Sequence, residues 1–272
     1  MSWLLEPLSY QFMQRGLAAS VMVGILCAVM GTYVVLRGMA FLGDAMAHAI
    51  LPGLAVAYVL HGNLLVGAAA AAVVVALGIG LFSRQGVVRE DTAIGILFAA
   101  ALSLGVALIS SIQTYAVDLS HILFGDVLGV SPSDLGLIAG LSLAILLTVA
   151  VCYRPFLVIS FDPVLAATLR LPAELLRNLM LVLLALTVVV SLQTVGVSLA
   201  AAMLVTPAAA AYLLTRRLWH MMLLSALIGA VSSVIGLYLS YYLNIVSGSA
   251  IVLTATAIFL AAFLWKRSRR GG

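Results

Sequence analysis

The feature that most constrains this chain is its succession of long apolar runs, which only short polar breaks separate. A helix needs about 20 predominantly apolar residues to cross the roughly 30 Å of hydrocarbon in a bilayer, and the runs approach or reach that length. Only 8% of the 272 residues are charged, whereas about a quarter are charged in a soluble domain. Because the chain cannot cover itself with polar surface, we expect the lipid membrane to be its solvent.

These runs predict an all-α, polytopic integral membrane protein with about nine transmembrane helices. A membrane barrel would need segments of about ten residues in which polar and apolar residues alternate, and a run such as AAAAAVVVALGIGLF does not alternate. No linker divides the sequence, so residues 1–272 are expected to form a single transmembrane domain. The expected spans are 12–36, 42–60, 64–82, 92–112, 135–153, 178–195, 198–214, 221–243 and 249–265.

The basic residues predict the orientation, because Lys and Arg near span ends are retained on the cytoplasmic side. Twelve of the 13 basic residues lie in every second connection between the expected spans or at the C-terminal end, which places them on one side of the membrane. Only Arg15 lies on the other side. We therefore expect the N-terminus outside and the C-terminus in the cytoplasm of a cell that carries the chain in its inner or plasma membrane. The first residues, MSWLLEPLSYQFMQR, lack the regions of a cleaved signal peptide, and this charge placement explains the basic pI without nucleic acid. The twelve residues are Arg37, Arg84, Arg89, Arg154, Arg170, Arg177, Arg216, Arg217, Lys266, Arg267, Arg269 and Arg270.

Of the nine acidic residues, only Asp44 falls inside an expected span, and of the four histidines only His48 does. The other acidic residues and histidines lie in connections or at span ends. Four-residue spacing places both side chains on one face of a helix. An Asp at membrane depth costs at least about 2.5 to 3.5 kcal/mol, so a functional role is the default interpretation. A carboxylate and an imidazole suit a divalent ion such as manganese or zinc. The local sequence also allows a helix-start Asp near the interface with His48 bonded to a neighbouring carbonyl.

Two ligands are too few for a closed metal site. Two copies of the chain that face each other across a pore would supply two carboxylates and two imidazoles, which is a plausible set of four. Pro52 follows the pair in the same span. We expect Pro52 to line the pathway, because broken helices at membrane depth are tolerated where they line a cavity or pack within protein.

Several other classes of activity lack their residues. ATP hydrolysis by this chain would need a phosphate-binding loop that contains a lysine, and the sole lysine is Lys266 near the C-terminus. Active transport would therefore need a separate ATPase subunit or an ion gradient. An intramembrane aspartyl protease needs two carboxylates, and only Asp44 is deep enough. Cys27 and Cys152 have no ligand-like spacing, so a packing role is expected for both.

The two longest polar interruptions are residues 113–134 on the outside and 154–177 on the inside. The outer segment suits a short surface helix, and its acidic residues and His121 could meet a partner or simply be solvated. The inner segment contains three prolines around a short amphipathic stretch, which suits docking against another protein.

The second span and several later segments resemble the permease subunits of ATP-binding cassette importers for manganese, zinc and chelated iron. The similarity is collinear over nearly the whole chain. The matching segments are Leu36 to Met39, Leu42 to Gly53, Glu90 to Gly95, Leu123 to Gly125 with Val130 and Ser131, Phe161 to Pro163, Gln193 to Gly196, and Pro207 to Ala209.

The resemblance implies a homodimeric permease channel, two cytoplasmic ATP-binding subunits and an extracytoplasmic metal-binding protein that delivers the ion. It also implies that Asp44 and His48 contact the transported metal, with no cofactor permanently bound. ATPase docking is expected near Phe161, Asp162, Pro163, Leu171 and Pro172. Manganese is the expected ion, with zinc or iron as alternatives.

Two other functions stay open at the level of sequence. A permease for a whole chelate, such as a siderophore or cobalamin, would want a wide apolar cavity instead of ligating side chains. A gradient-driven secondary carrier or a membrane enzyme would act without an ATPase partner.

Overall fold

The computed structural model describes residues 6–84, 88–111, 127, 129–161, 166 and 168–269. These residues form helices and connections without a β-strand, which confirms the expected all-α class. After a short 3-10 helix, η1 (Pro7–Ser9), the helices are α2 (Gln11–Leu36), α3 (Leu42–Ala49), α4 (Leu51–Val59), α5 (Leu64–Phe82), α6 (Glu90–Ser110), α8 (Pro132–Val151), α9 (Tyr153–Phe161), α11 (Ala173–Val195), α12 (Val197–Leu214), α13 (Leu218–Leu243) and α14 (Ser247–Ser268).

Within the described part of the chain, eight helical segments are long and apolar enough to cross a membrane. The consecutive helices α3 and α4 count as one of them, Leu42–Val59. The ninth expected span, 198–214, corresponds to α12, whose apolar part Leu199–Leu214 is shorter. Helix α11 begins at Ala173, earlier than the expected residue 178, because a polar first turn that carries Glu174 extends beyond the apolar run.

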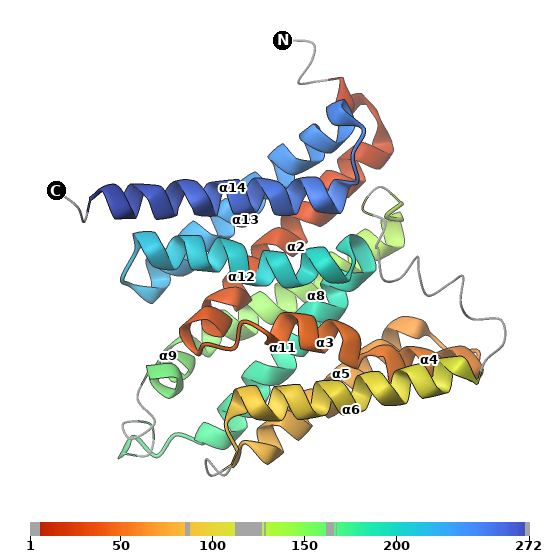
Figure 1. The fold of residues 1–272 in the computed structure, drawn as a ribbon, viewed down its shortest axis with the longest axis vertical. Coiled ribbons are helices and arrows are strands. Elements are labelled where there is room, and N and C mark those ends of the chain that lie inside the picture. Colours follow the sequence, from red (N-terminus) through yellow and green to blue (C-terminus); the bar gives the residue numbers. More distant parts are fainter. Residues whose placement is uncertain are drawn as a thin grey trace.

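The helices pack into two groups that are joined by α3 and by α11, which packs against α5 and α2 (Figure 1). Helix α2 packs against α12, α13 and α8, and α14 covers α12 and α13. On the other side, α4 packs against α5 and α6. Helix α3 contacts α6 from this second group and α12 from the first, so its residues lie between the two groups.

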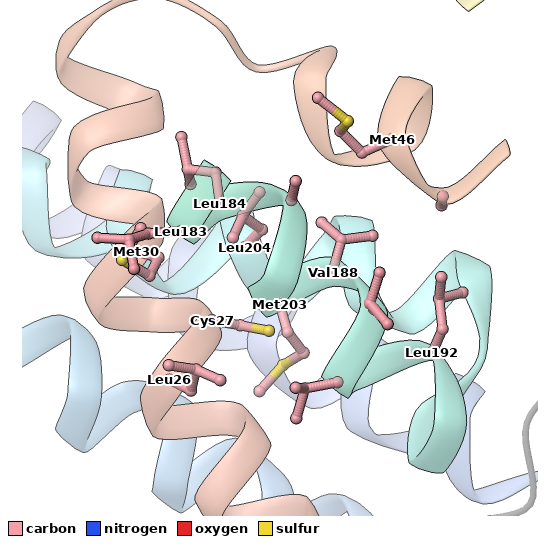
Figure 2. Packing of buried hydrophobic residues seen from close by; sticks show 14 of the residues in the cluster. Leu26, Cys27, Met30, Met46, Leu183, Leu184, Val188, Leu192, Met203 and Leu204 are labelled. Carbon is pink, nitrogen blue, oxygen red and sulfur yellow. The ribbon is translucent and has the colours of Figure 1, made fainter. Parts of the chain in front are cut away.

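The core lies between α2, α11 and α12, where side chains such as Cys27, Leu184 and Leu204 are fully buried (Figure 2). Cys27 forms no disulfide and is fully buried beside the Ser191 hydroxyl, in agreement with the expected packing role. Glycines allow α2 and α12 to approach closely, because a Cβ on Gly31 would lie 1.6 Å from the Leu204 carbonyl oxygen. Such small residues let backbones approach within a membrane, where no hydrophobic force drives helices together.

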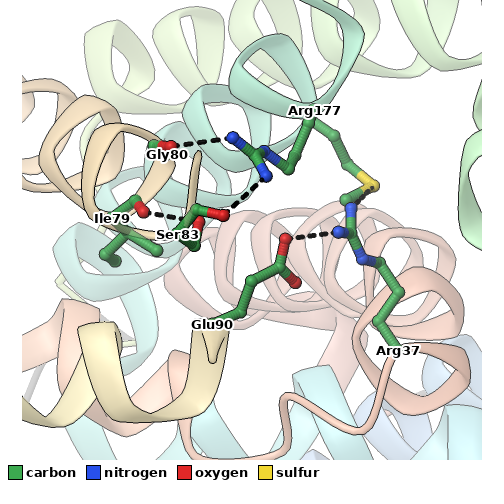
Figure 3. Close-up of polar contacts among 7 residues, drawn as sticks. Arg37, Ile79, Gly80, Ser83, Glu90 and Arg177 are labelled. Atoms are coloured by element: carbon green, nitrogen blue, oxygen red, sulfur yellow. Dashed lines mark hydrogen bonds and ion pairs between the residues drawn. The ribbon is translucent and has the colours of Figure 1, made fainter. Parts of the chain in front are cut away.

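One end of the bundle collects several connections through polar contacts (Figure 3). Arg37, directly after α2, pairs with Glu90 at the start of α6 at 2.5 Å. Arg177 of α11 donates to the carbonyl oxygens of Gly80 and Ser83 at the end of α5, at 2.8 and 3.2 Å. The ends of α2 and α5 and the starts of α6 and α11 therefore lie together, as expected for connections on one side of a membrane.

The long connections are described only in part. The surface helix expected within 113–134 falls almost entirely outside the described residues, as do Asp118, His121 and Asp126. Asp134 is described and completes a capping box with the N-cap residue Ser131 of α8, because the Asp134 N–H donates to Ser131 Oγ and the Ser131 N–H donates to Asp134 Oδ2, both at 3.2 Å. Of the inner segment, α9 is a short helix that ends at Phe161, and residues 162–165 and 167 lie outside the description.

Candidate functional site

Asp44 and His48 lie on the single uncovered face of α3. Within this helix Leu42, Gly43, Ala45, Met46, Ala47 and Ala49 are buried against neighbouring helices. The Asp44 side chain is 47% exposed and that of His48 is 32% exposed. The i, i+4 spacing therefore places the two polar groups side by side on one helical face, as the sequence predicts.

The two side chains face each other without a hydrogen bond that would satisfy them. His48 Nε2 lies 3.9 Å from Asp44 Oδ1, which is within ion-pair range but beyond hydrogen-bond distance. Neither side chain forms a hydrogen bond to another residue in the described part of the chain. The alternative in which a neighbouring carbonyl satisfies His48 therefore finds no support among the described residues.

The helix that carries the pair breaks directly after it. Helix α3 ends at Ala49 and α4 begins at Leu51, with Pro52 in the first turn of α4. Proline has no backbone N–H and its ring clashes with the carbonyl four residues earlier, which here belongs to His48. The break is the one that Pro52 predicts, and it occurs one turn after the candidate ligand.

Glycines fix the position of this break. A Cβ on Gly53 would lie 2.1 Å from the Gly67 carbonyl oxygen of α5, and one on Gly105 of α6 would lie 2.7 Å from the Cβ of Leu51. Because α4 touches the backbones of α5 and α6 so closely, the break cannot shift without moving both helices. These contacts with α5 and α6 therefore hold in place the backbone that directly follows Asp44 and His48.

Aromatic side chains flank the pair on the α6 side. The rings of His48 and Phe98 meet edge to face with centroids 6.0 Å apart, and Phe98 meets Phe41 at 5.5 Å in the same manner. Phe41 directly precedes α3. These contacts limit the orientations of the imidazole and leave Asp44 as the more accessible ligand.

The Arg37–Glu90 pair anchors the connection that leads into α3. The Arg37 side chain is 13% exposed and that of Glu90 is 20% exposed. Burial lowers the pKa of Arg37 from its ordinary value, the Glu90 carboxylate opposes that shift, and the charge of Arg177 adds to it. Gly38 follows with φ +69°, a left-handed conformation that suits glycine. The turn before α3 is thus tied to the first turn of α6.

An apolar groove lies beside the site but excludes the pair. It has a volume of about 610 Å³ and runs between α4, α5 and α6, with Pro52, Val56 and Leu104 among its walls. Asp44 and His48 do not line it. Pro52 thus faces this groove, and the two potential metal ligands lie outside it.

The remaining candidate ligands are scattered. His61, in a left-handed turn after α4, and His220, near the start of α13, are both exposed. Among the described residues no group of three or more His, Cys, Asp or Glu side chains could hold a metal ion. No single place in the described part of one chain therefore offers more than two ligands of these types.

The expected docking segment is only partly described. Phe161 is 61% exposed at the end of α9, Pro172 is exposed and Leu171 is half-buried. Asp162 and Pro163 lie outside the described residues. The sequence did not predict the Arg37–Glu90 pair, although both residues occur in segments that carry the family resemblance.

Comparisons with known proteins agree with this arrangement. Residues 9–266 match the model of the ABC 3 transport family. The chain is 46% identical to the manganese transport system membrane protein MntC of Halalkalibacterium halodurans, over 96% of this chain and 89% of the relative. It is 41% identical to the manganese import system permease protein ScaB of Streptococcus parasanguinis, over 93% and 90%.

A solved structure shares the fold over nearly its whole length. It is PsaBC from Streptococcus pneumoniae in complex with Fab, and it superposes with a TM-score of 0.84 at 38% identity, covering 96% of this chain and 95% of that chain. The chain therefore belongs to the ABC 3 transport family and is a multi-pass protein of the plasma membrane.

Proposed function

We propose that this chain is the membrane permease of an ATP-driven manganese importer and that Asp44 and His48 bind the ion on its way across the membrane. The observation that carries the proposal is the unsatisfied pair on α3. A carboxylate and an imidazole, half-exposed and without other hydrogen-bond partners among the described residues, lie in a chain whose solvent is lipid. Ionisable groups in that position are costly and mark ion pathways.

The pair supplies half of a site. Two copies of the chain related by a two-fold axis would bring two Asp44 carboxylates and two His48 imidazoles together, since an isologous interface presents the same patch from both subunits. The exposed face of α3 is available for this contact, because the other faces are covered by α6, α11 and α12. A homodimeric channel is therefore part of the proposal.

Manganese is the proposed ion. Relatives that are 41 to 46% identical carry the names of manganese transport or import proteins, and oxygen ligands suit Mn²⁺ while imidazole also suits other first-row ions. The half-exposed carboxylate is the more accessible of the two groups. Zinc and iron remain the competitors against which an assay must be run.

The orientation follows from charge. The end of the bundle with Arg37, Arg84 and Arg177 is proposed to face the cytoplasm, since basic residues near span ends are retained there. With α12 as the ninth span, the N-terminus lies outside. The ATP-binding subunit would then dock at the same end, on the segment from Phe161 to Pro172, and a metal-binding protein would deliver the ion from the other side.

The test is manganese uptake by the purified permease reconstituted in liposomes with its ATP-binding subunit and the metal-binding protein that delivers the ion. Uptake is expected to require ATP and the ATP-binding subunit, and Asp44→Asn and His48→Gln are expected to abolish it. Asp91→Asn and His220→Gln make the same chemical changes at exposed positions near helix starts and are expected to leave uptake unchanged. Full uptake by Asp44→Asn contradicts the site, and uptake by the permease alone contradicts the ATP-driven mechanism.

A further inference from the structure

A second cavity lies at the end of the bundle that carries the basic residues, away from the Asp44–His48 pair. It has a volume of about 550 Å³ and lies where the ends of α2, α12 and α14 meet the start of α13. A cavity of this size is in the range that holds a small molecule or the headgroup of a lipid. Neither Asp44 nor His48 lines it.

Three cationic side chains line this cavity: Arg216 and Arg217 from the turn between α12 and α13, and Lys266 from the last turn of α14. None of the three forms an ion pair or a side-chain hydrogen bond with any residue that the structure describes. By contrast, Arg37, Arg84 and Arg177 at the same end each have a carboxylate or carbonyl partner. Three uncompensated positive charges around one cavity favour an anion within it.

Apolar side chains also line the cavity. Leu213 and Leu214 at the end of α12, Leu218 and Met221 in the first turn of α13, and Leu36 at the end of α2 contribute them. The cavity thus combines cationic side chains with apolar residues at the ends of membrane-spanning helices. This combination matches a phospholipid, whose charged phosphate is joined to acyl chains.

We propose that the cavity binds the phosphate headgroup of an anionic phospholipid, with Arg216, Arg217 and Lys266 around the phosphate. Basic pockets between transmembrane helices bind such headgroups on the side where anionic lipid lies. The start of α13 contributes in a minor way, because its first N–H groups have no side-chain cap and favour negative charge.

A free phosphate ion would use the same cations but would gain nothing from the leucines and Met221. A lipid gains from both, which is why it is the proposed source of the phosphate. Cations at the ends of α12 and α14 also complement the negative ends of those helices. That contribution to helix stability would not depend on which lipid is present. The experiment below therefore separates lipid binding by these cations from their effect on the helix ends.

The experiment measures lipid binding by the full-length permease, purified in detergent and stripped of lipid. Native mass spectrometry with phosphatidylglycerol and with phosphatidylcholine of the same acyl chains gives the two affinities. Phosphatidylglycerol is expected to bind more tightly. Arg216→Gln with Arg217→Gln is expected to weaken it roughly 10- to 30-fold, since each basic residue near an anionic headgroup contributes about fivefold.

The control is Arg267→Gln with Arg269→Gln, which removes the same net charge at and directly after the end of α14, from residues that do not line the cavity. This variant is expected to bind phosphatidylglycerol as the unaltered protein does. Equal weakening in both double variants, or no preference between the two lipids, overturns the proposal. If the permease binds glycerol phosphate or inorganic phosphate as tightly as phosphatidylglycerol, the lipid is not the source of the phosphate. If the Arg216 and Arg217 double variant loses binding of the ATP-binding subunit but keeps lipid binding, the cations serve a protein partner and the proposal is overturned.

Discussion

Replacing Glu90 by Gln is expected to destabilise the permease by about 3 to 4 kcal/mol, because it leaves a buried guanidinium without its partner. The Arg37 and Glu90 side chains are only 13% and 20% exposed, so water compensates the loss weakly. Arg177 is near enough for its charge to oppose that of Arg37. Without Glu90, the Arg37 guanidinium would keep the unfavourable charge interaction with Arg177 and lose the carboxylate that offsets it.

The converse change has a smaller expected cost. In Arg37→Gln, the Glu90 carboxylate stays in the first turn of α6, where negative charge is favoured, so the loss is expected to be about 1 to 2 kcal/mol, below the 3 to 5 kcal/mol typical of a buried charge left unpaired. The double variant is expected to cost less than the sum of the two single changes, with a coupling free energy of at least about 1 kcal/mol. The asymmetry between the single variants follows because Arg177 opposes the charge of Arg37, whereas the start of α6 favours the charge of Glu90.

Reversible unfolding of the purified permease in mixed micelles measures these free energies. The matched control is Glu174→Gln, which breaks the Arg84–Glu174 pair at the same end of the bundle. That pair is 2.9 Å long with side chains 54% and 51% exposed, so its loss is expected to cost less than about 1 kcal/mol. If Glu90→Gln and Glu174→Gln lower stability equally, or if the Arg37 and Glu90 changes are additive, the reasoning is refuted.

Other predictions concern packing and helix capping. Gly31→Ala is expected to lower the melting temperature strongly, because the added Cβ would lie 1.6 Å from the Leu204 carbonyl oxygen. Its control is Gly95→Ala, whose Cβ would meet nothing within 4 Å and which is expected to raise stability by up to about 1 kcal/mol. Equal melting temperatures of the two variants would contradict the close approach of α2 and α12. Ser131→Ala removes the capping box of α8 and is expected to cost about 1 kcal/mol. Ser110→Ala, which removes a hydroxyl bonded only within α6, is its control, and both are checked by the same unfolding measurement.

Much of the fold was predictable from the sequence, because each span carries its own signal. Apolar runs long enough for a bilayer gave the helices, and Pro52 gave the break between α3 and α4. The start of α11 was misplaced by five residues, since the polar first turn around Glu174 is helical although it is not apolar. Hydropathy detects the part of a helix that lies in lipid, not its polar extension.

The candidate site was predictable to the same extent. Asp44 and His48 stood out because each residue is unusual on its own in an apolar run, and the spacing of four needs no tertiary information. The Arg37–Glu90 pair was not predictable, because its members are 53 residues apart and ordinary in connections. The cationic cavity likewise depends on α14 returning to the turn between α12 and α13, which no local pattern encodes.

The most direct test of the account is the stoichiometry of manganese binding to the purified permease, measured by electron paramagnetic resonance of free Mn²⁺ at equilibrium. The account predicts one ion for every two chains, and at least about 100-fold weaker binding in Asp44→Asn and in His48→Gln, since even indirect partners of metal ligands are worth 10- to 100-fold. One ion per chain would contradict the shared site. Unchanged binding in either variant would contradict the role of the pair itself.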